Sequence, residues 1–146
     1  MQIYLDMCSI QRPLDDKSQL RVRLEAEAVL GIIAHCESGQ AALVSSDALD
    51  FETRRCPHSV RRAHALGILV KATHFVGLSP GVEARARTLT QAGLKSLDAL
   101  HFSCAVEANV DYFCTCDDRL LKRLRAAHNG APKVVSPLEL VEELGL

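Results

Sequence analysis

Two acidic residues stand at the ends of strand-like segments that lie far apart in the sequence. Asp6 follows the apolar run 2–5, and Asp117 follows the run 112–116. Carboxylates that a fold brings together repel each other, so some of them must take up a proton or a cation. Their hard oxygen atoms suit Mg²⁺ or Mn²⁺, which activates a bound water and neutralises charge on a phosphoryl oxygen. If the two strands are neighbours, this pair indicates phosphodiester hydrolysis at a metal site.

The elements that must position these residues alternate between strand and helix. Short apolar runs predict strands at residues 2–6, 41–45, 74–78, 112–116 and 133–135. Helix caps, glycine stops and apolar periodicity predict helices at residues 17–37, after Ser46, and at 57–71, 81–92, 96–108, 118–127 and 138–144. In the first helix a repeat of four residues predicts one buried face, made of Leu20, Leu24, Ala28, Ile32 and Cys36. Residues 7–16 are expected to form a loop.

This order of elements predicts an α/β fold. We expect a three-layer α/β/α sandwich with a central, mostly parallel sheet, formed as a single domain over residues 1–146. Ligands of such sheets bind beyond the carboxyl ends of the strands, at the point where the strand order reverses. Asp6 and Asp117 stand at strand ends of this kind.

Composition narrows the function classes. Apolar residues make up 48% of the chain and aromatic residues only 4%, which predicts an aliphatic core. A net charge of −1 provides no global positive field, so any nucleic acid must be bound by local basic groups. The two candidate groups are Arg54, Arg55, Arg61 and Arg62, and Arg119, Lys122, Arg123 and Arg125. Such groups hold phosphates in a nuclease, although charged runs are more often solvated helix faces.

The six cysteines are interpreted as free thiols of a cytoplasmic protein, because they are scattered in apolar segments and no signal peptide or membrane-spanning run is recognisable. Cys114 and Cys116 share one face of a strand, but the spacing offers no two further zinc ligands. No glycine-rich phosphate loop is present, which weighs against nucleotide binding by a P-loop or a Rossmann turn.

Four segments resemble the PIN-domain family in their order along the chain. They are Tyr4-Leu5-Asp6, Ser45-Ser46 leading to Glu52, Leu97-Asp98-Ala99-Leu100-His101, and Thr115-Cys116-Asp117. The closing segment 132–140 is similar to the last strand and helix of the family, so the resemblance spans nearly the whole chain. It implies that Asp6, Glu52, Asp98 and Asp117 are the catalytic and metal-binding acids, with Mg²⁺ or Mn²⁺ as the cofactor. One departure is Cys8, because many PIN domains carry Asn or Ser two residues after the first Asp.

Each acid also has a structural interpretation. Asp6 can close a turn, Asp98 lies where a helix dipole favours an anion, and Asp117 is a good helix cap. Glu52 is selected over Asp47 and Asp50 only by the family spacing. Asp118 is a candidate accessory ligand. His101 lies one helical turn from Asp98 and faces either the core or the cleft, with core packing as the expected role.

The resemblance implies a metal-dependent endoribonuclease that hydrolyses RNA. More finely, it implies a VapC-like toxin of a toxin–antitoxin pair, which forms a homodimer and is inhibited by a small antitoxin protein that covers or enters the active site. Two alternatives stay open. The chain is either a non-catalytic RNA-binding or assembly module with the PIN fold, or an unrelated α/β signalling domain whose acids are caps. Convergence of the four carboxylates distinguishes the last alternative from the other two.

Overall fold

Five short strands form one sheet in the computed structural model, which describes all of residues 1–146. The strands are β1 (Gln2–Leu5), β2 (Ala42–Ser46), β3 (His74–Val76), β4 (Tyr112–Cys114) and β5 (Lys133–Val135). Their order across the sheet is β3-β2-β1-β4-β5, and every pair is parallel. The predicted α/β fold with a central parallel sheet is therefore confirmed.

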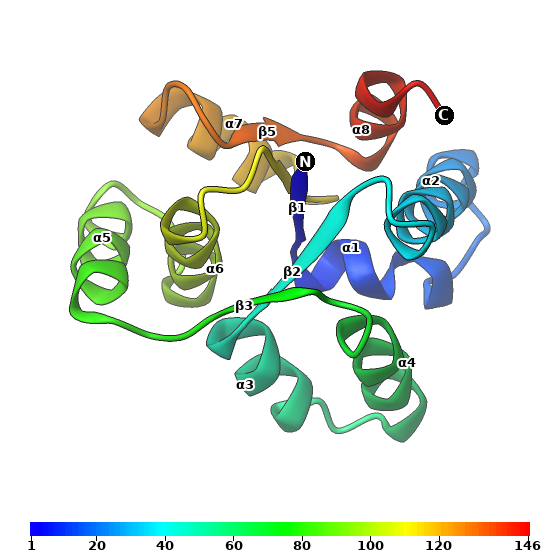
Figure 1. Ribbon diagram of the computed structural model, residues 1–146, viewed down its shortest axis with the longest axis horizontal. Helices are drawn as coiled ribbons and strands as arrows, with labels where there is room; N and C mark the ends of the chain where they lie inside the picture. Colours follow the sequence, from blue (N-terminus) through cyan, green and yellow to red (C-terminus); the bar gives the residue numbers. More distant parts are fainter.

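The helices cover both faces of this sheet. They are α1 (Met7–Gln11), α2 (Leu20–Glu37), α3 (Asp47–Arg55), α4 (Ser59–Leu69), α5 (Pro80–Gln91), α6 (Ser96–Glu107), α7 (Asp118–Ala127) and α8 (Pro137–Leu144), with a 3₁₀ helix η1 (Arg12–Leu14) after α1. Figure 1 shows α5 and α6 side by side on one side of the sheet, and α2 and α8 on the other. No helix combines the length and the apolar character needed to cross a bilayer.

The strand order reverses at the centre of the sheet. After β1 the chain adds β2 and β3 on one side, and it then returns to place β4 and β5 on the other side. In β1, Leu5 pairs with Cys114 of β4, so the residues that follow these two strands leave the same edge together. Ligand sites in open parallel sheets form at this kind of reversal. The edge between β1 and β4 is therefore where a site is expected.

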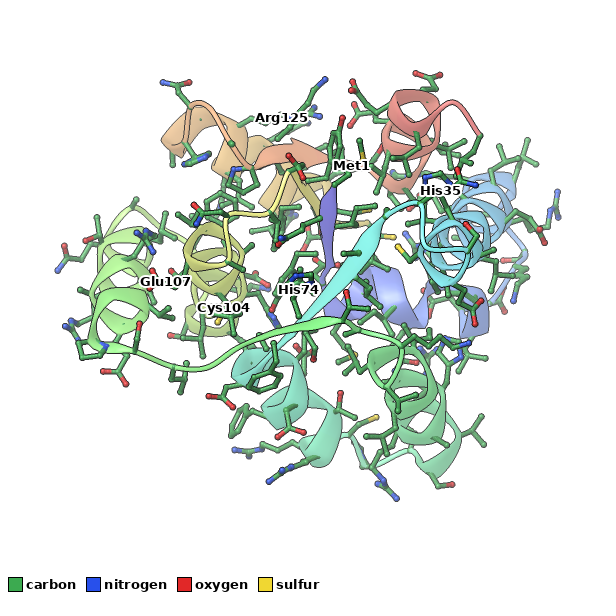
Figure 2. All side chains as sticks on the ribbon, in the orientation of Figure 1. Met1, His35, His74, Cys104, Glu107 and Arg125 are labelled. Carbon is green, nitrogen blue, oxygen red and sulfur yellow. The ribbon has the colours of Figure 1, made fainter.

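The core combines aliphatic residues with a small aromatic cluster. Tyr4 stacks on Phe113 with ring centroids 5.5 Å apart, and Phe102 meets Phe113 edge-on at 5.2 Å. These three side chains are almost completely buried, and Figure 2 shows how densely side chains fill the space between sheet and helices. The composition predicted an aliphatic core, and this prediction is only partly right. Three of the few aromatic residues lie together at the centre of the core.

The N-terminal third departs most from the sequence prediction. Residues 7–16 were expected to be a loop, but they contain α1 and η1. A five-residue helix is too short to reveal a helical period, and α1 is stabilised instead by the cap from Asp6. The predicted buried face of α2 is also wrong at its start, since Leu20 and Leu24 are 60% and 47% exposed.

An ion-pair network lies at the buried face of α2. Glu25 is 1% exposed, and its carboxylate accepts hydrogen bonds from Arg21 Nε at 2.6 Å and Arg12 Nη2 at 3.3 Å. A buried carboxylate needs such partners, and they allow the face that carries Glu25 and Val29 to point to the interior. Hydrophobic periodicity alone therefore misplaced the first two turns of this helix.

Candidate active site

The four carboxylates selected in the sequence line one pocket of about 100 Å³ at the carboxyl edge of the sheet. They come from four separate places: the junction of β1 and α1 for Asp6, α3 for Glu52, the first turn of α6 for Asp98, and the start of α7 for Asp117. Met7, Cys8 and His101 complete the lining. Burial decreases from Asp6, which is 5% exposed, through half-buried Glu52 and Asp98 to exposed Asp117. The pocket therefore has a buried acidic floor and an open side.

Asp6 is held in place by the turn that follows β1. Its Oδ1 accepts hydrogen bonds from the backbone N–H of Ser9 and from the thiol of Cys8, both at 3.0 Å. Burial raises the pKa of Asp6, and hydrogen bonds from Cys8, Thr115 and Ser9 oppose that rise. The same carboxylate thus caps α1 and faces the pocket.

Asp98 and Asp117 are the acids that line both this pocket and its neighbour, and their charges interact. Burial raises the pKa of Asp98, and the negative charges of Asp6 and Asp117 raise it further. Asp117 uses Oδ1 to cap α7, accepting from the backbone of Arg119 at 2.9 Å and Leu120 at 3.1 Å. Its Oδ2 accepts no hydrogen bond in this arrangement. Capping and pocket lining are therefore compatible in Asp117.

A buried chain of hydrogen bonds runs from Glu52 into the core. His101 Nε2 lies 2.7 Å from Glu52 Oε1, His101 Nδ1 lies 2.7 Å from the Tyr4 hydroxyl, and that hydroxyl lies 2.7 Å from Ser46 Oγ. An ionised carboxylate only accepts hydrogen bonds, so in a neutral ring Nε2 carries the proton and Nδ1 accepts from Tyr4. Burial raises the pKa of Tyr4, which keeps its hydroxyl a donor. Glu52 is therefore oriented by the core itself.

The sequence argument favoured core packing for His101 over a place in the cleft, and it gave Tyr4 no part in orienting an acid. His101 is 2% exposed, as core packing requires, yet it also lines the pocket. A signal was present in the spacing. Tyr4 precedes Asp6 by two residues, and His101 follows Asp98 by three, which places each near an acid on a strand or a helix.

Cys8 replaces the polar residue of the family pattern without loss of a hydrogen bond. Its sulfur donates to Asp6 Oδ1 and lies 3.5 Å from Thr115 Oγ1. A hydrogen bond with Cys116, partial burial of the sulfur and the charge of Asp6 raise the pKa of Cys8 well above its usual value. The thiol therefore stays protonated and remains a donor. Cys8 is exposed, whereas Cys104, Cys114 and Cys116 are buried, and no disulfide joins any of the six cysteines.

The neighbouring acids have other partners. Asp118 forms a double ion pair with Arg21, at 2.6 and 2.7 Å, and does not line the pocket. Asp47 accepts from the backbone of Leu78 at 2.8 Å, and Asp50 pairs with Arg54 at 2.9 Å. The structure thus separates Glu52 from the two acids that could have replaced it.

The donor set fits a hard divalent cation by its chemistry. It consists of oxygen ligands, and burial raises the pKa of Asp6 and, together with the charges of Asp6 and Asp117, that of Asp98, so a cation bound beside them would favour their ionised forms. No three of the side chains converge tightly enough to hold one ion as they stand. Binding a cation would therefore draw the carboxylates inward, which the free Oδ2 of Asp117 and the half-buried Glu52 and Asp98 permit.

The two predicted basic groups differ in their partners. In the first group, Arg54 and Arg61 form ion pairs with Asp50 and Asp15, Arg55 lies over the Phe51 ring, and Arg62 donates to a backbone carbonyl. In the second group, Arg125 donates to the Val134 carbonyl and to Glu139, and Figure 2 labels it on α7. The remaining three, Arg119, Lys122 and Arg123, form no ion pair.

A family model and a solved structure match most of this chain. A family model described as PIN domain matches residues 23–127, a range that includes Glu52, Asp98 and Asp117 but begins after Asp6. A similar solved structure is titled "Crystal Structure of FitAcB from Neisseria gonorrhoeae", with a TM-score of 0.56 and 12% sequence identity over 93% of this chain and 98% of that chain. At this identity the likeness concerns the fold alone. Comparison with curated protein sequences gives no significant match.

Proposed function

This chain belongs to the PIN domain family, and we propose that it is an endoribonuclease that hydrolyses RNA phosphodiester bonds with Mg²⁺ or Mn²⁺ held by Asp6, Glu52, Asp98 and Asp117. Members of this family are typically metal-dependent nucleases. The observation that carries the proposal is that four acids from four separate elements line one pocket at the point where the strand order reverses. Helix capping alone explains Asp6 and Asp117, but it gives no reason for Glu52 and Asp98 to face them.

Each acid would have a distinct task. Asp6 supplies an oxygen whose position is fixed by Ser9 and Cys8. Glu52 is oriented by His101, which makes His101 a positioning residue rather than a ligand. Asp98 accepts no hydrogen bond and Asp117 keeps Oδ2 free, so both can turn toward a cation. Asp6, Glu52, Asp98 and Asp117 would hold the cation, which would there lower the pKa of a bound water and neutralise charge on a phosphoryl oxygen.

The finer proposal is that the protein is a VapC-like toxin of a toxin–antitoxin pair. It is supported by the family to which the chain belongs. The corresponding partners are RNA as substrate, a small antitoxin protein that blocks the pocket, and a second copy of the chain. Expression of the chain alone should arrest growth, and Asp98→Asn should relieve that arrest. Normal growth with the wild-type chain expressed and folded would contradict the toxin proposal.

The nuclease proposal is tested by RNA cleavage with Mn²⁺ supplied and with EDTA present. We expect cleavage by the wild type only with Mn²⁺, and no cleavage by Asp6→Asn or Asp98→Asn, since the amide keeps the shape and removes the charge. Asp16→Asn is the matched control, because Asp16 is exposed and its acceptor role toward Ser18 survives in Asn. An active Asp98→Asn variant would remove Asp98 from the mechanism. A wild type that binds RNA without cleaving it would instead support the non-catalytic binding module.

A further inference from the structure

A second pocket adjoins the candidate active site and contains three basic side chains. Its volume is about 70 Å³, and it shares Asp98 and Asp117 with the carboxylate pocket. Lys95, Arg119 and Arg123 belong to the same lining. Three cations thus lie next to two of the proposed metal ligands.

Three separate features bring these cations together. Arg119 and Arg123 are four residues apart on α7, so they project from the same face of that helix. Gly93 has a φ of +104°, a conformation that other residues rarely adopt, and it turns the chain from α5 into α6, delivering Lys95 to the pocket. Arg123 also donates to the Gly93 carbonyl, which ties α7 to this turn. The arrangement is therefore built by the fold and does not depend on chance proximity of long side chains.

The charges of this pocket are available to a ligand. Lys95, Arg119 and Arg123 form no ion pair, whereas Arg54, Arg61 and Arg125 are each paired with a carboxylate. The first turn of α6 opens beside the pocket, and no side chain caps its backbone N–H groups. Such a helix end adds a partial positive charge. Three free cations and an uncapped helix outweigh the two carboxylates that the pockets share.

An anion of the right size and charge for this pocket is a phosphate group. Guanidinium groups bind phosphate oxygens through paired N–H donors, and lysine contributes a mobile point charge. The two shared acids set the spacing, because a phosphate seated here lies beside the carboxylates that would hold the cation. A nucleic acid chain whose phosphate occupied this pocket would therefore pass beside Asp98 and Asp117.

We infer that Lys95, Arg119 and Arg123 form a phosphate subsite that holds the RNA backbone next to the bond that is cut. The inference rests on the proposed nuclease function for the identity of the chain that binds, and on the pocket for its location. It also changes the assignment of the basic groups, since Lys95 joins Arg119 and Arg123, and Lys122 and the Arg54–Arg62 group lie outside. The subsite positions the substrate and reads no base sequence.

The test is binding of a fluorescently labelled single-stranded RNA, followed by anisotropy at increasing KCl. EDTA is present throughout, so that no divalent cation supports cleavage and the wild-type protein can be used. The pocket variant is Lys95→Gln/Arg119→Gln, because neither side chain makes a hydrogen bond that the fold would lose. The matched control is Lys122→Gln/Arg23→Gln, which removes the same charge from exposed residues outside the pocket.

Each phosphate contact contributes about 0.7 to the slope of log affinity against log salt, which at 0.1 M salt amounts to roughly fivefold in affinity. The pocket variant should therefore bind about 25-fold more weakly than the wild type, with a slope reduced by about 1.4. The control should keep the wild-type slope and most of the affinity. Equal affinity and slope in the pocket variant and the control would overturn the subsite.

The outcomes separate this inference from the proposed function. If the wild type cleaves RNA with Mn²⁺ while the pocket variant binds normally, the nuclease proposal stands and the subsite is wrong. If the wild type never cleaves, yet its binding of RNA depends on Lys95 and Arg119, the subsite stands and the nuclease proposal is wrong. Absence of RNA binding by the wild type would overturn the subsite as well.

Discussion

Replacing Asp98 by Asn should stabilise the metal-free protein and remove its response to Mn²⁺. Asp98 is half-buried and accepts no hydrogen bond, while its pKa is raised by burial and by the charges of Asp6 and Asp117. Neutralising it removes a desolvated charge from among like charges, at the cost of a favourable helix-dipole interaction of about 0.3–1 kcal/mol. The expected sign for the apo protein is therefore a higher melting temperature.

The size of the metal response follows from linkage. A ligand present at 100 times its Kd stabilises the folded state by about 2.7 kcal/mol, which for a chain of this length raises Tm by roughly 5–10 °C. If the loss of one carboxylate weakens binding 100-fold or more, the same Mn²⁺ concentration adds at most about 0.4 kcal/mol to Asp98→Asn, or about 1 °C. If Asp98 is a metal ligand, Asp98→Asn should therefore be more stable than the wild type without metal and less stable than the wild type with Mn²⁺.

The assay is thermal unfolding of wild type, Asp98→Asn and the control Asp16→Asn, each with EDTA and with a series of Mn²⁺ concentrations. Asp16→Asn should follow the wild type. An Asp98→Asn protein that gains as much as the wild type from Mn²⁺ would exclude Asp98 as a ligand. A wild type whose Tm does not change with Mn²⁺ or Mg²⁺ would refute the metal site altogether.

Four further outcomes are expected. The raised pKa values of Asp6 and Asp98 mean that the folded state binds their protons more tightly than the unfolded chain does. In EDTA, the free energy of unfolding should therefore fall as the pH rises from about 4, the pKa in the unfolded chain, through the raised pKa values. Urea titrations should show a weaker dependence on pH for Asp98→Asn. His101→Phe removes two hydrogen bonds of 2.7 Å, so it should cost about 1–3 kcal/mol in urea unfolding and weaken the stabilisation by Mn²⁺. Tyr4→Phe leaves the hydrogen bond to Glu52 intact and should weaken that stabilisation less. Equal stabilisation of the two variants by Mn²⁺ would deny His101 a positioning role. Glu25→Gln removes the buried negative charge that Arg12 and Arg21 share, while these arginines keep Asp15 and Asp118 as their other partners. The loss of two charged hydrogen bonds should cost about 1.5–3 kcal/mol by urea unfolding, compared with no clear change for the exposed Glu27→Gln. A neutral Glu25→Gln would mean that packing alone orients α2. Thiol titration after unfolding without reductant should recover all six cysteines, and fewer than six would reveal a disulfide absent from this structure.

The sequence by itself determined the features that depend on neighbouring residues. The alternation of strands and helices was predictable because apolar periodicity and capping are local, and the caps at Ser46 and Asp117 act as expected. The positions of Asp6 and Asp117 at strand ends followed from the same patterns. Local patterns failed for α1, which is shorter than the period that would reveal it.

Tertiary structure alone decided which of these residues meet. The pairing of β1 with β4 brings Asp6 to Asp117, and no local signal specifies that partner. The residues themselves did not distinguish Glu52 from Asp47 and Asp50, because the difference lies in remote partners: Asp47 is held by Leu78, whereas Glu52 is held by His101.

The same reason applies to the charged residues of the surface. Sequence treats Arg61 and Arg119 alike, yet Arg61 is paired with an aspartate 46 positions away and Arg119 is free beside the acids. A glutamate within a helix is normally expected on the exposed face, but Glu25 is buried and forms ion pairs with Arg12 and Arg21. Whether a charge is used by the fold or left for a ligand depends on contacts between distant segments, and these exist only once the chain has folded.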